Sequence, residues 1–320
     1  MSPTKKILEL IRQSRDVTIT YHVNPDGDAL GSALAMKDLV RSFKKKAVII
    51  GSDKPSPRYN FLSGFNSIKF LSWGSSLKIN TDLLIVLDSP EMDRIGHIRN
   101  NIIAKKIIKI DHHLSHEHFG DVNYVNAKAA ATGELVFGVF SQGRIKLSRE
   151  TARALYAAIA TDTGFFSQEN TRKETFEIIS KLVAIGVLPD EMYRAICGER
   201  ELKYFQLESQ VRNTLVLHNK GRVASIEIKY PWNKKYDAAN TDTNDFFASL
   251  KCLRGVQVMV LFWERKPKEI KMSLRSRKTF NVCRLAQIFG GGGHRLAAGC
   301  TIKGSLSHVK QKLLSQIKLR

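Results

Sequence analysis

Cysteine is scarce in this chain of 320 residues, and none of its four cysteines stands in a CxxC pair. Neither a disulfide framework nor a cysteine-ligated zinc site is indicated, so we expect a protein of a reducing compartment. Long apolar runs are also missing: stretches such as residues 83–87 meet a charge within a few positions, far short of the ~18 apolar residues of a membrane span. The first 15 residues mix charge into their apolar positions, unlike a signal peptide. We therefore expect a soluble, cytoplasmic protein with no membrane partner.

Acidic residues are few relative to basic ones, with 30 Asp and Glu against 51 Lys and Arg and a net charge of +21. Most of the excess, +15, lies in residues 215–320, which hold 21 basic and six acidic residues. A basic C-terminal third favours a polyanionic ligand such as a nucleic acid or a nucleotide, although a solvated surface would have the same composition. The 43% of hydrophobic residues argue against an intrinsically disordered chain.

The first half alternates short apolar runs with amphipathic stretches, a pattern typical of βα units and a mostly parallel sheet. Its predicted strands are 17–21, 47–50, 83–87 and 107–110, and its predicted helices are 29–43, 151–160 and 171–185. The second half has predicted strands at 222–230, 255–263 and 271–274 and a short helix at 282–289. We predict an α/β fold with three parts: a catalytic domain with a mostly parallel sheet and flanking helices at 1–190, a helical connector at 191–214, and a smaller α/β domain at 215–320.

Several of the few acidic residues stand just past the C-terminal end of a predicted strand. Asp88 follows LLIVL, and Asp111 follows IIKI. Asp26 and Asp28 lie shortly after the first strand. Ligands of open α/β sheets bind at this edge, and carboxylates gathered there would repel one another unless cations lay between them.

Histidines accompany these carboxylates: His22 near the first pair, and His112 and His113 directly after Asp111. Oxygen ligands with one or two imidazoles suit Mg²⁺ or Mn²⁺ better than zinc. Asp162 opens a Thr/Gly loop in AIATDTGFF and is a candidate fifth carboxylate. Each residue alone is more often a cap or turn residue, but their coincidence at one sheet edge indicates a metal centre.

Four segments resemble, in order, the motifs of the DHH phosphoesterase superfamily: HVNPDGDALGSALAM, VLDSPEMDRIG, IDHHLSHEHFGDVNYV and ATDTGFF. Two further segments, SLRS at 273–276 and FGGGGHRLAAG at 289–299, resemble the signature of its DHHA1 domain. The chain is most similar to the NrnA-type bifunctional oligoribonucleases (nano-RNases) and pAp phosphatases. RecJ exonucleases share the motifs but are typically longer and carry an OB-fold domain, for which this chain has little room.

The resemblance implies a site with two Mn²⁺ ions, or Mg²⁺ in their place. One ion would be held by His22, Asp26 and Asp88. The other would be held by Asp28, Asp88, His112 and Asp162, so that Asp88 bridges the two. Asp111 would orient an imidazole or the loop by hydrogen bonding, and His113 would face the substrate phosphate.

The DHHA1 signature implies a phosphate-binding segment in the C-terminal domain. Gly291, Gly292 and Gly293 would let backbone N–H groups approach a phosphate closely. His294 and Arg275 would add charge-assisted contacts to a terminal phosphate. A helix C-cap needs only one glycine, so a run of four followed by His fits the signature better than a cap.

One segment departs from the family pattern. After TDTG many members have a basic residue within two positions, whereas Phe165 and Phe166 stand here. This leaves Asp162 as a metal ligand but puts substrate contacts from the loop in doubt, and the phenylalanines either pack in the core or stack a base. His116 and His118 have no family role and are predicted as loop residues.

These features predict a metal-dependent phosphoesterase that cleaves short RNA or DNA oligonucleotides, pApA among them, to nucleoside monophosphates and pAp to AMP, with water activated by two metals. The alternatives are a RecJ-like single-strand DNA exonuclease, a pyrophosphatase-like enzyme and a non-catalytic nucleic-acid-binding protein. The GGGH segment argues against the pyrophosphatase-like enzyme. The chain length argues against a full RecJ. The complete set of predicted ligands argues against a non-catalytic binding protein. The preferred substrate, the end attacked and the oligomeric state stay open, a homodimer included.

Overall fold

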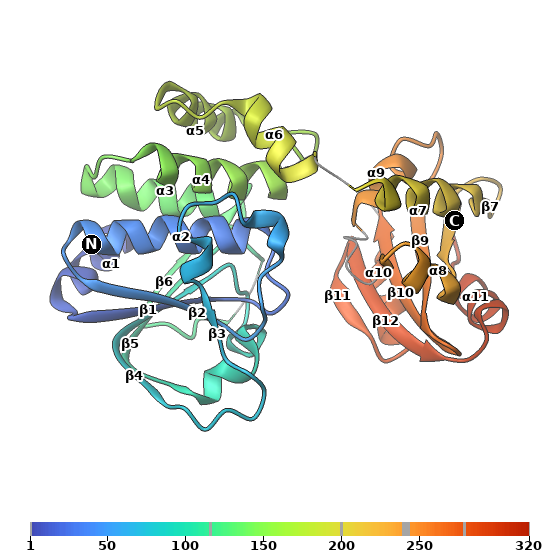
Figure 1. Cartoon of the computed structure of the whole chain (residues 1–320), viewed down its shortest axis with the longest axis horizontal. Coiled ribbons are helices and arrows are strands. Elements are labelled where there is room, and N and C mark those ends of the chain that lie inside the picture. The colour runs from blue at the N-terminus through green and yellow to red at the C-terminus, as the bar shows by residue number, and fades with distance from the viewer. Residues whose placement is uncertain (1, 115–116, 199–200, 239–243, 278–279, 320) are drawn as a thin grey trace. The chain divides into compact units, whose positions relative to one another are not determined.

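A computed structural model describes the chain except for residues 1, 115–116, 199–200, 239–243, 278–279 and 320 (Figure 1). The chain forms two compact units, residues 1–199 and 200–320, and this division falls inside the stretch 191–214. The predicted α/β fold, with a parallel sheet and helices in the first part and a second α/β domain after it, is confirmed. Among the described helices, none has the length and apolar character needed to cross a bilayer.

The first unit is built on a six-stranded sheet in the order β3-β2-β1-β4-β5-β6, with every neighbouring pair parallel. Its strands are β1 (Asp16–Tyr21), β2 (Lys46–Gly51), β3 (Lys69–Phe70), β4 (Ile79–Leu87), β5 (Ile102–Asp111) and β6 (Val122–Val125). Its helices are α1 (Pro3–Gln13), α2 (Gly27–Ser42), α3 (Thr132–Gly143), α4 (Arg149–Asp162), α5 (Lys173–Ala184) and α6 (Pro189–Cys197), and its 3₁₀ segments are η1 (Pro57–Tyr59), η2 (Phe65–Ser67) and η3 (Met92–Asn100).

Both faces of this sheet are covered, which explains why β4 and β5 read as nearly continuous apolar runs. Leu83, Ile85 and Leu87 point into the large core that α1 to α4 close, and these helices gather on one side of the sheet in Figure 1. Leu84 and Val86 point to the opposite side, where they pack against η3. The buried sheet leaves the ends of its strands as the place where polar side chains meet.

The strand order also marks the place for a ligand. The chain runs from β1 outward through β2 to β3, and then returns to β4 on the other side of β1 before it continues to β5 and β6. The order therefore reverses between β1 and β4, and parallel sheets bind ligands beyond the carboxyl ends of strands at such a point. The sequence patterns do not predict α1, α3, β3 and β6, and α3 contributes directly to the site.

The second unit has a mixed sheet in the order β11-β12-β10-β9-β8-β7, in which β8 and β9 are parallel and the other neighbours antiparallel. Its strands are β7 (Val216–His218), β8 (Val223–Ile228), β9 (Val258–Lys266), β10 (Glu269–Ser276), β11 (Gly292–His294) and β12 (Ala297–Lys303). Its helices are α7 (Leu202–Asn213), α8 (Tyr230–Lys235), α9 (Asn244–Leu250), α10 (Val282–Gln287) and α11 (Leu306–Leu314).

Alternate residues of β9 pack into two different hydrophobic cores. Val260 and Phe262 pack on the side of α10 and α11. Leu261 and Trp263 pack on the other side, with Leu207 of α7 and with α9. This unit therefore has its own core on both faces of its sheet, as expected of an independently folding domain.

Helix α2 crosses α4 at close range, and Gly31 permits the approach. A Cβ atom at Gly31 would lie 2.3 Å from the carbonyl oxygen of Ala154. We expect Gly31→Ala to lower the free energy of unfolding by about 1–3 kcal/mol, because the added methyl forces the helices apart. Urea unfolding followed by circular dichroism measures this.

The matched control is Gly138→Ala in α3, where the added Cβ would meet the Tyr124 hydroxyl at 3.2 Å. There the gain in helix propensity of up to about 1 kcal/mol offsets the tight contact, so the stability should stay within about 1 kcal/mol of the wild type. A Gly31→Ala variant as stable as this control would show that the helices can move apart without cost.

Candidate metal centre

The turn from β1 into α2 carries the first polar side chains to the sheet edge. His22 follows β1 directly, and its Nδ1 donates to the carbonyl oxygen of Val23 at 2.8 Å. Asp26 is the N-cap of α2 and accepts from the backbone N–H groups of Asp28 and Ala29 at 3.0 and 3.1 Å. The cap fixes Asp26 at the start of the helix, with its oxygens near the imidazole of His22.

Asp28 is fully buried and is held by the start of another helix. Its Oδ2 accepts from the N–H of Thr132 at 2.6 Å, and its Oδ1 accepts from the N–H of Gly133 at 2.9 Å and from Ser32 Oγ at 2.9 Å. The first N–H groups of α3 have no partner within their own helix, so the carboxylate satisfies them and meets the positive end of the helix dipole.

Asp88 lies at the centre of the site, one residue past β4, and is 2% exposed. Its backbone is left-handed with φ of 54°, a conformation that is costly for a residue with a side chain and that persists only where the surroundings enforce it. The N–H of Asp88 donates to the carbonyl of Ile110 at 3.0 Å, and its Oδ1 accepts from Thr132 Oγ1 at 3.1 Å. These bonds hold the carboxylate between two imidazoles.

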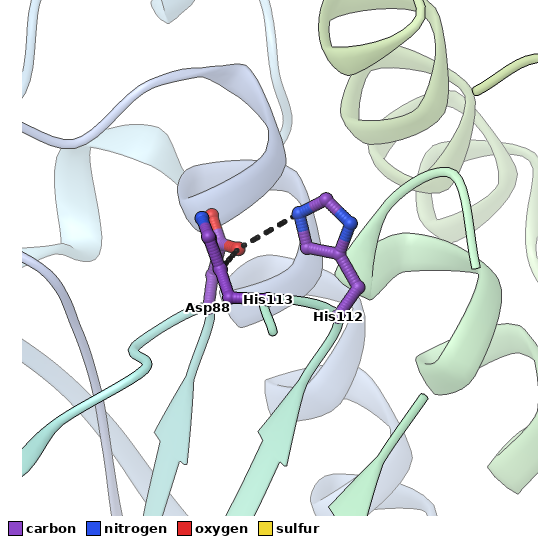
Figure 2. Close-up of side chains that lie close together, drawn as sticks. All are labelled: Asp88, His112 and His113. Carbon is purple, nitrogen blue, oxygen red and sulfur yellow. Dashed lines mark ion pairs between the residues drawn. The ribbon is translucent and has the colours of Figure 1, made fainter. Parts of the chain in front are cut away.

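His112 and His113, which follow β5 directly, supply the other imidazoles near Asp88. His112 donates from Nδ1 to the carbonyl of Ala129 at 3.2 Å. Its Nε2 lies 3.3 Å from Asp162 Oδ2, 3.6 Å from Asp88 Oδ1 and 3.9 Å from Asp28 Oδ2. Figure 2 shows His112 and His113 beside Asp88, with dashed lines from the carboxylate to both rings; Asp88 Oδ1 lies 3.6 Å from His113 Nδ1. His113 Nδ1 lies 2.8 Å from Asp111 Oδ1.

The structure brings all the predicted metal ligands together in two groups. Within each group the ligand atoms lie within 4.8 Å of one another; one group is His22, Asp26 and Asp88, and the other is Asp28, His112 and Asp162. A third set at the same spacing, Asp88, His112 and His113, overlaps both and includes His113, which was not predicted as a ligand. Asp88 faces both groups, because its oxygens lie 3.4 Å from His22 Nε2 and 3.6 Å from His112 Nε2.

The distances between the donor atoms suit ligands of one divalent cation better than direct hydrogen bonds between the side chains. Because Nδ1 of His22 and of His112 donates to a carbonyl, the unshared pair of each neutral ring is on Nε2, which faces the carboxylates. The distances of 3.3–3.9 Å exceed those of normal hydrogen bonds, about 2.7–3.2 Å. Two atoms bound at about 2.1 Å to one ion are about 3.0–3.6 Å apart, which matches most of these distances.

The electrostatics of the site also favour a bound cation. Burial and the negative charges of Asp88 and Asp162 raise the pKa of Asp28 well above its usual value. Burial and the same kind of repulsion raise the pKa of Asp162. Burial lowers the pKa of His22, but the carboxylates of Asp26 and Asp88 outweigh this effect and raise that pKa to about 11. Without metal the site therefore holds protons where a cation would otherwise balance the charge.

The loop after α4 gives the two phenylalanines a packing role. Phe165 and Phe166 have positive φ of 53° and 66° and pack against the core of the first unit. The ring of Phe165 meets Tyr193 edge-on at 5.0 Å, and the ring of Phe166 lies 5.6 Å from Phe176. This is the first of the two interpretations that the sequence left open. His118 is an exposed loop residue, and His116 lies outside the described residues.

The sequence does not predict three residues whose hydrogen bonds hold the site in place. Thr132 and Gly133 bind Asp28 and Asp88 from the start of α3. Asn170 donates from Nδ2 to the carbonyls of Asp162 and Ala130 at 3.1 and 3.0 Å, and so ties the last turn of α4 to the segment before α3. Only the segment ATGE at 131–134, with a small polar residue before an acidic one, gave a signal of a helix start.

In the second unit, the predicted phosphate-binding residues lie on β10, on β11 and, for Gly291, directly before β11. The Arg275 guanidinium lies 5.1 Å above the ring of Phe247 and donates to the carbonyl of Leu274 at 2.9 Å. A Cβ at Gly291 or Gly293 would lie 2.2 or 2.6 Å from a β12 carbonyl, so strand pairing itself requires these glycines. A Cβ at Gly292 would meet open space. His294 ends β11, and its side chain is not described.

Two protein-family models match different parts of this chain. The model of the DHH family, N-terminal domain, matches residues 16–159, and that of the DHHA1 domain matches residues 223–319. A Streptococcus mutans protein named "Probable bifunctional oligoribonuclease and PAP phosphatase NrnA" is 31% identical over 93% of this chain and 93% of its own. This chain belongs to the DHH family.

Two further similar proteins match nearly the whole chain. A Thermus thermophilus protein named "Bifunctional oligoribonuclease and PAP phosphatase NrnA" is 28% identical over 94% of this chain and 89% of its own. The crystal structure of an exopolyphosphatase-related protein from Bacteroides fragilis superposes with a TM-score of 0.90 at 26% identity, covering 98% of this chain and 94% of that one. The resemblance to the DHH family that the motifs indicated is confirmed.

The repulsion between the carboxylates of the site leads to a prediction about the stability of the metal-free protein at different pH values. A carboxyl whose pKa is raised in the folded protein destabilises the metal-free fold increasingly as the pH rises above its usual value of 3.8. We therefore expect Mn²⁺ to raise the melting temperature over an EDTA sample, and to do so more at pH 8 than at pH 6. Differential scanning fluorimetry at both pH values measures this, and an equal or opposite pH trend would contradict it.

The same repulsion can be relieved by Asp162→Asn. This variant should raise the melting temperature of the metal-free protein by roughly 2–4 °C at pH 8 and should reduce the stabilisation by Mn²⁺. The control is Asp190→Asn, which removes an exposed carboxylate of α6 paired with Arg194 and should leave both values unchanged.

Proposed function

We propose that this protein is a metal-dependent phosphoesterase that hydrolyses short oligonucleotides to nucleoside monophosphates and pAp to AMP. The observation that carries the proposal is the pair of ligand groups at the switch point of the sheet, together with Asp88, which belongs to one group and lies 3.6 Å from His112 of the other. Relatives named as bifunctional oligoribonucleases and PAP phosphatases at 31% and 28% identity support the substrate class.

The proposed cofactor is a pair of Mn²⁺ ions, with Mg²⁺ as the substitute. One ion binds His22, Asp26 and Asp88, and the other binds Asp28, Asp88, His112 and Asp162. When bound, such a pair neutralises the phosphate and lowers the pKa of a water. The chain offers oxygen and imidazole ligands and no cysteine within either group, which suits these hard cations.

We assign distinct roles to the two residues that flank His112. Asp111 accepts from His113 Nδ1 and fixes the ring, so Nε2 of His113 is the atom that can meet the substrate phosphate. Burial lowers the pKa of His113, but the hydrogen bond to Asp111 and the charge of Asp88 outweigh this effect and raise it. A protonated Nε2 can then donate a charge-assisted hydrogen bond to a phosphate oxygen.

The domain roles follow the same proposal, with catalysis in residues 1–190, a connector at 191–214 and substrate binding in 215–320. Arg275, the backbone of Gly291, Gly292 and Gly293, and His294 would bind a terminal phosphate of the nucleotide. Because pAp carries a 3′-phosphate where the next nucleotide of a chain would be joined, one site can serve both reactions. Recognition of a terminal phosphate favours short substrates such as pApA and attack from a chain end.

A turnover assay with Mn²⁺ tests the proposal directly. We expect fast release of AMP from pAp and pApA, slower cleavage of a 5-mer RNA, little action on long single-stranded DNA or pyrophosphate, and no turnover in EDTA. Preference for long DNA would indicate a RecJ-like exonuclease. Binding of oligonucleotide without turnover of any substrate, despite bound Mn²⁺, would overturn the enzymatic proposal.

Two variants separate the proposed roles of the two units. Asp88→Ala removes the shared ligand and should lower kcat more than about 100-fold, because even partners of metal ligands are worth 10–100-fold. Arg275→Ala should raise KM about 10-fold or more with kcat largely kept, the cost of one charge-assisted contact. Arg284→Ala removes an exposed arginine of α10 and is the control for charge alone. An equal loss of kcat in the first two variants would contradict these assignments.

A further inference from the structure

A lysine is fully buried directly behind the metal centre. Lys109 lies in β5, two residues before Asp111, and its side chain is 0% exposed. Lysines are almost never fully buried unless they are paired, because removing an ammonium group from water is costly. Other lysines of the same strand, such as Lys105 and Lys106, are 80% and 54% exposed. The burial of Lys109 therefore requires an explanation of its own.

The contacts of Lys109 join the segments that carry the site. Its Nζ donates to the carbonyl of Pro90, two residues after Asp88, at 2.5 Å. It also donates to the carbonyl of Glu117, in the loop after the two histidines, at 2.9 Å. The ring of Phe119 lies 5.0 Å from the ammonium and shields it on another side. Lys109 thus fixes both loops that leave the central strands.

The ammonium also faces the carboxylate that orients His113. Lys109 Nζ lies 3.5 Å from Asp111 Oδ2, and both side chains are 0% exposed. Within the part of the chain that the structure describes, Asp111 Oδ2 has no hydrogen-bond partner. The other oxygen, Oδ1, accepts from the ring of His113 at 2.8 Å and from its backbone N–H at 3.2 Å. The charge of Lys109 therefore balances this buried carboxylate from the side of Oδ2, at ion-pair distance and without a hydrogen bond.

We propose that Lys109 is a positioning residue that acts through Asp111 on His113. The ammonium holds the Asp111 carboxylate in the orientation that directs Oδ1 to Nδ1 of His113, which leaves Nε2 as the ring atom for the substrate. This inference rests on the proposed function for the role of His113. It adds a third member, from the interior of the sheet, to the Asp–His pair of the sequence motif.

The test compares Lys109→Met with Lys106→Met, which removes an exposed lysine of the same strand paired with Asp121 at 2.7 Å. With Mn²⁺ and pApA we expect Lys109→Met to lower kcat about 10–100-fold with little change in KM, because a group behind the reacting atoms is lost. Lys106→Met should behave as the wild type. Each variant is first checked for folding by circular dichroism, and Lys109→Gln replaces Lys109→Met if the latter does not fold.

A double-mutant cycle and a spectroscopic measurement distinguish positioning from a structural role. If Lys109 acts through Asp111, adding Lys109→Met to Asp111→Asn should cost less than about twofold more in kcat. In metal-free protein, at a pH high enough to deprotonate the imidazolium, ¹⁵N NMR should show neutral His113 as the Nδ1–H tautomer in the wild type and as a mixture in Lys109→Met; His113→Gln assigns the signal.

The outcomes separate this inference from the proposed function. Multiplying losses in the double variant, or an unchanged tautomer with unchanged kcat in Lys109→Met, would overturn the positioning role. Absence of turnover in the wild type would instead overturn the proposed function, and the tautomer measurement would still decide the role of Lys109.

Discussion

Repulsion among buried carboxylates is the constraint on which this structure depends. Asp28 and Asp88 are 0% and 2% exposed, and Asp26 and Asp162 stand beside them. The fold tolerates this cluster because the N–H groups at the start of α3 bind Asp28 and imidazoles line Asp88. Stability is thus lost at one edge of the sheet, and the helix start and the imidazoles at that edge compensate for part of the loss.

The site is organised in layers behind the ligands. Backbone carbonyls fix Nδ1 of His22 and His112, so that both rings present Nε2 to the carboxylates. Asp111 does the same for His113, and Lys109 faces Asp111 from within the sheet. Each outer group orients the next one inward, which is how a site made mostly of loop residues attains fixed geometry.

The sequence predicted the parallel sheet and the clustering of ligands, because apolar runs followed by acidic residues are local patterns. It did not predict α3, whose segment mixes β-branched and aromatic residues with three glycines and has weak helix propensity. The contacts of Thr132 with Asp28 and Asp88 span 104 and 44 residues, and no local pattern encodes them. Lys109 likewise reads as one more lysine of a basic strand until the fold shows what surrounds it.

The ligand groups lie between His22 and Asp162, within the first unit. This has a consequence for the order of events during synthesis. At about 5–20 residues per second, the ribosome needs roughly 8–30 s to add residues 163–320 after Asp162. A cation that binds the nascent first unit in this interval would neutralise the carboxylates of the site before the strongly basic stretch 215–320 is complete.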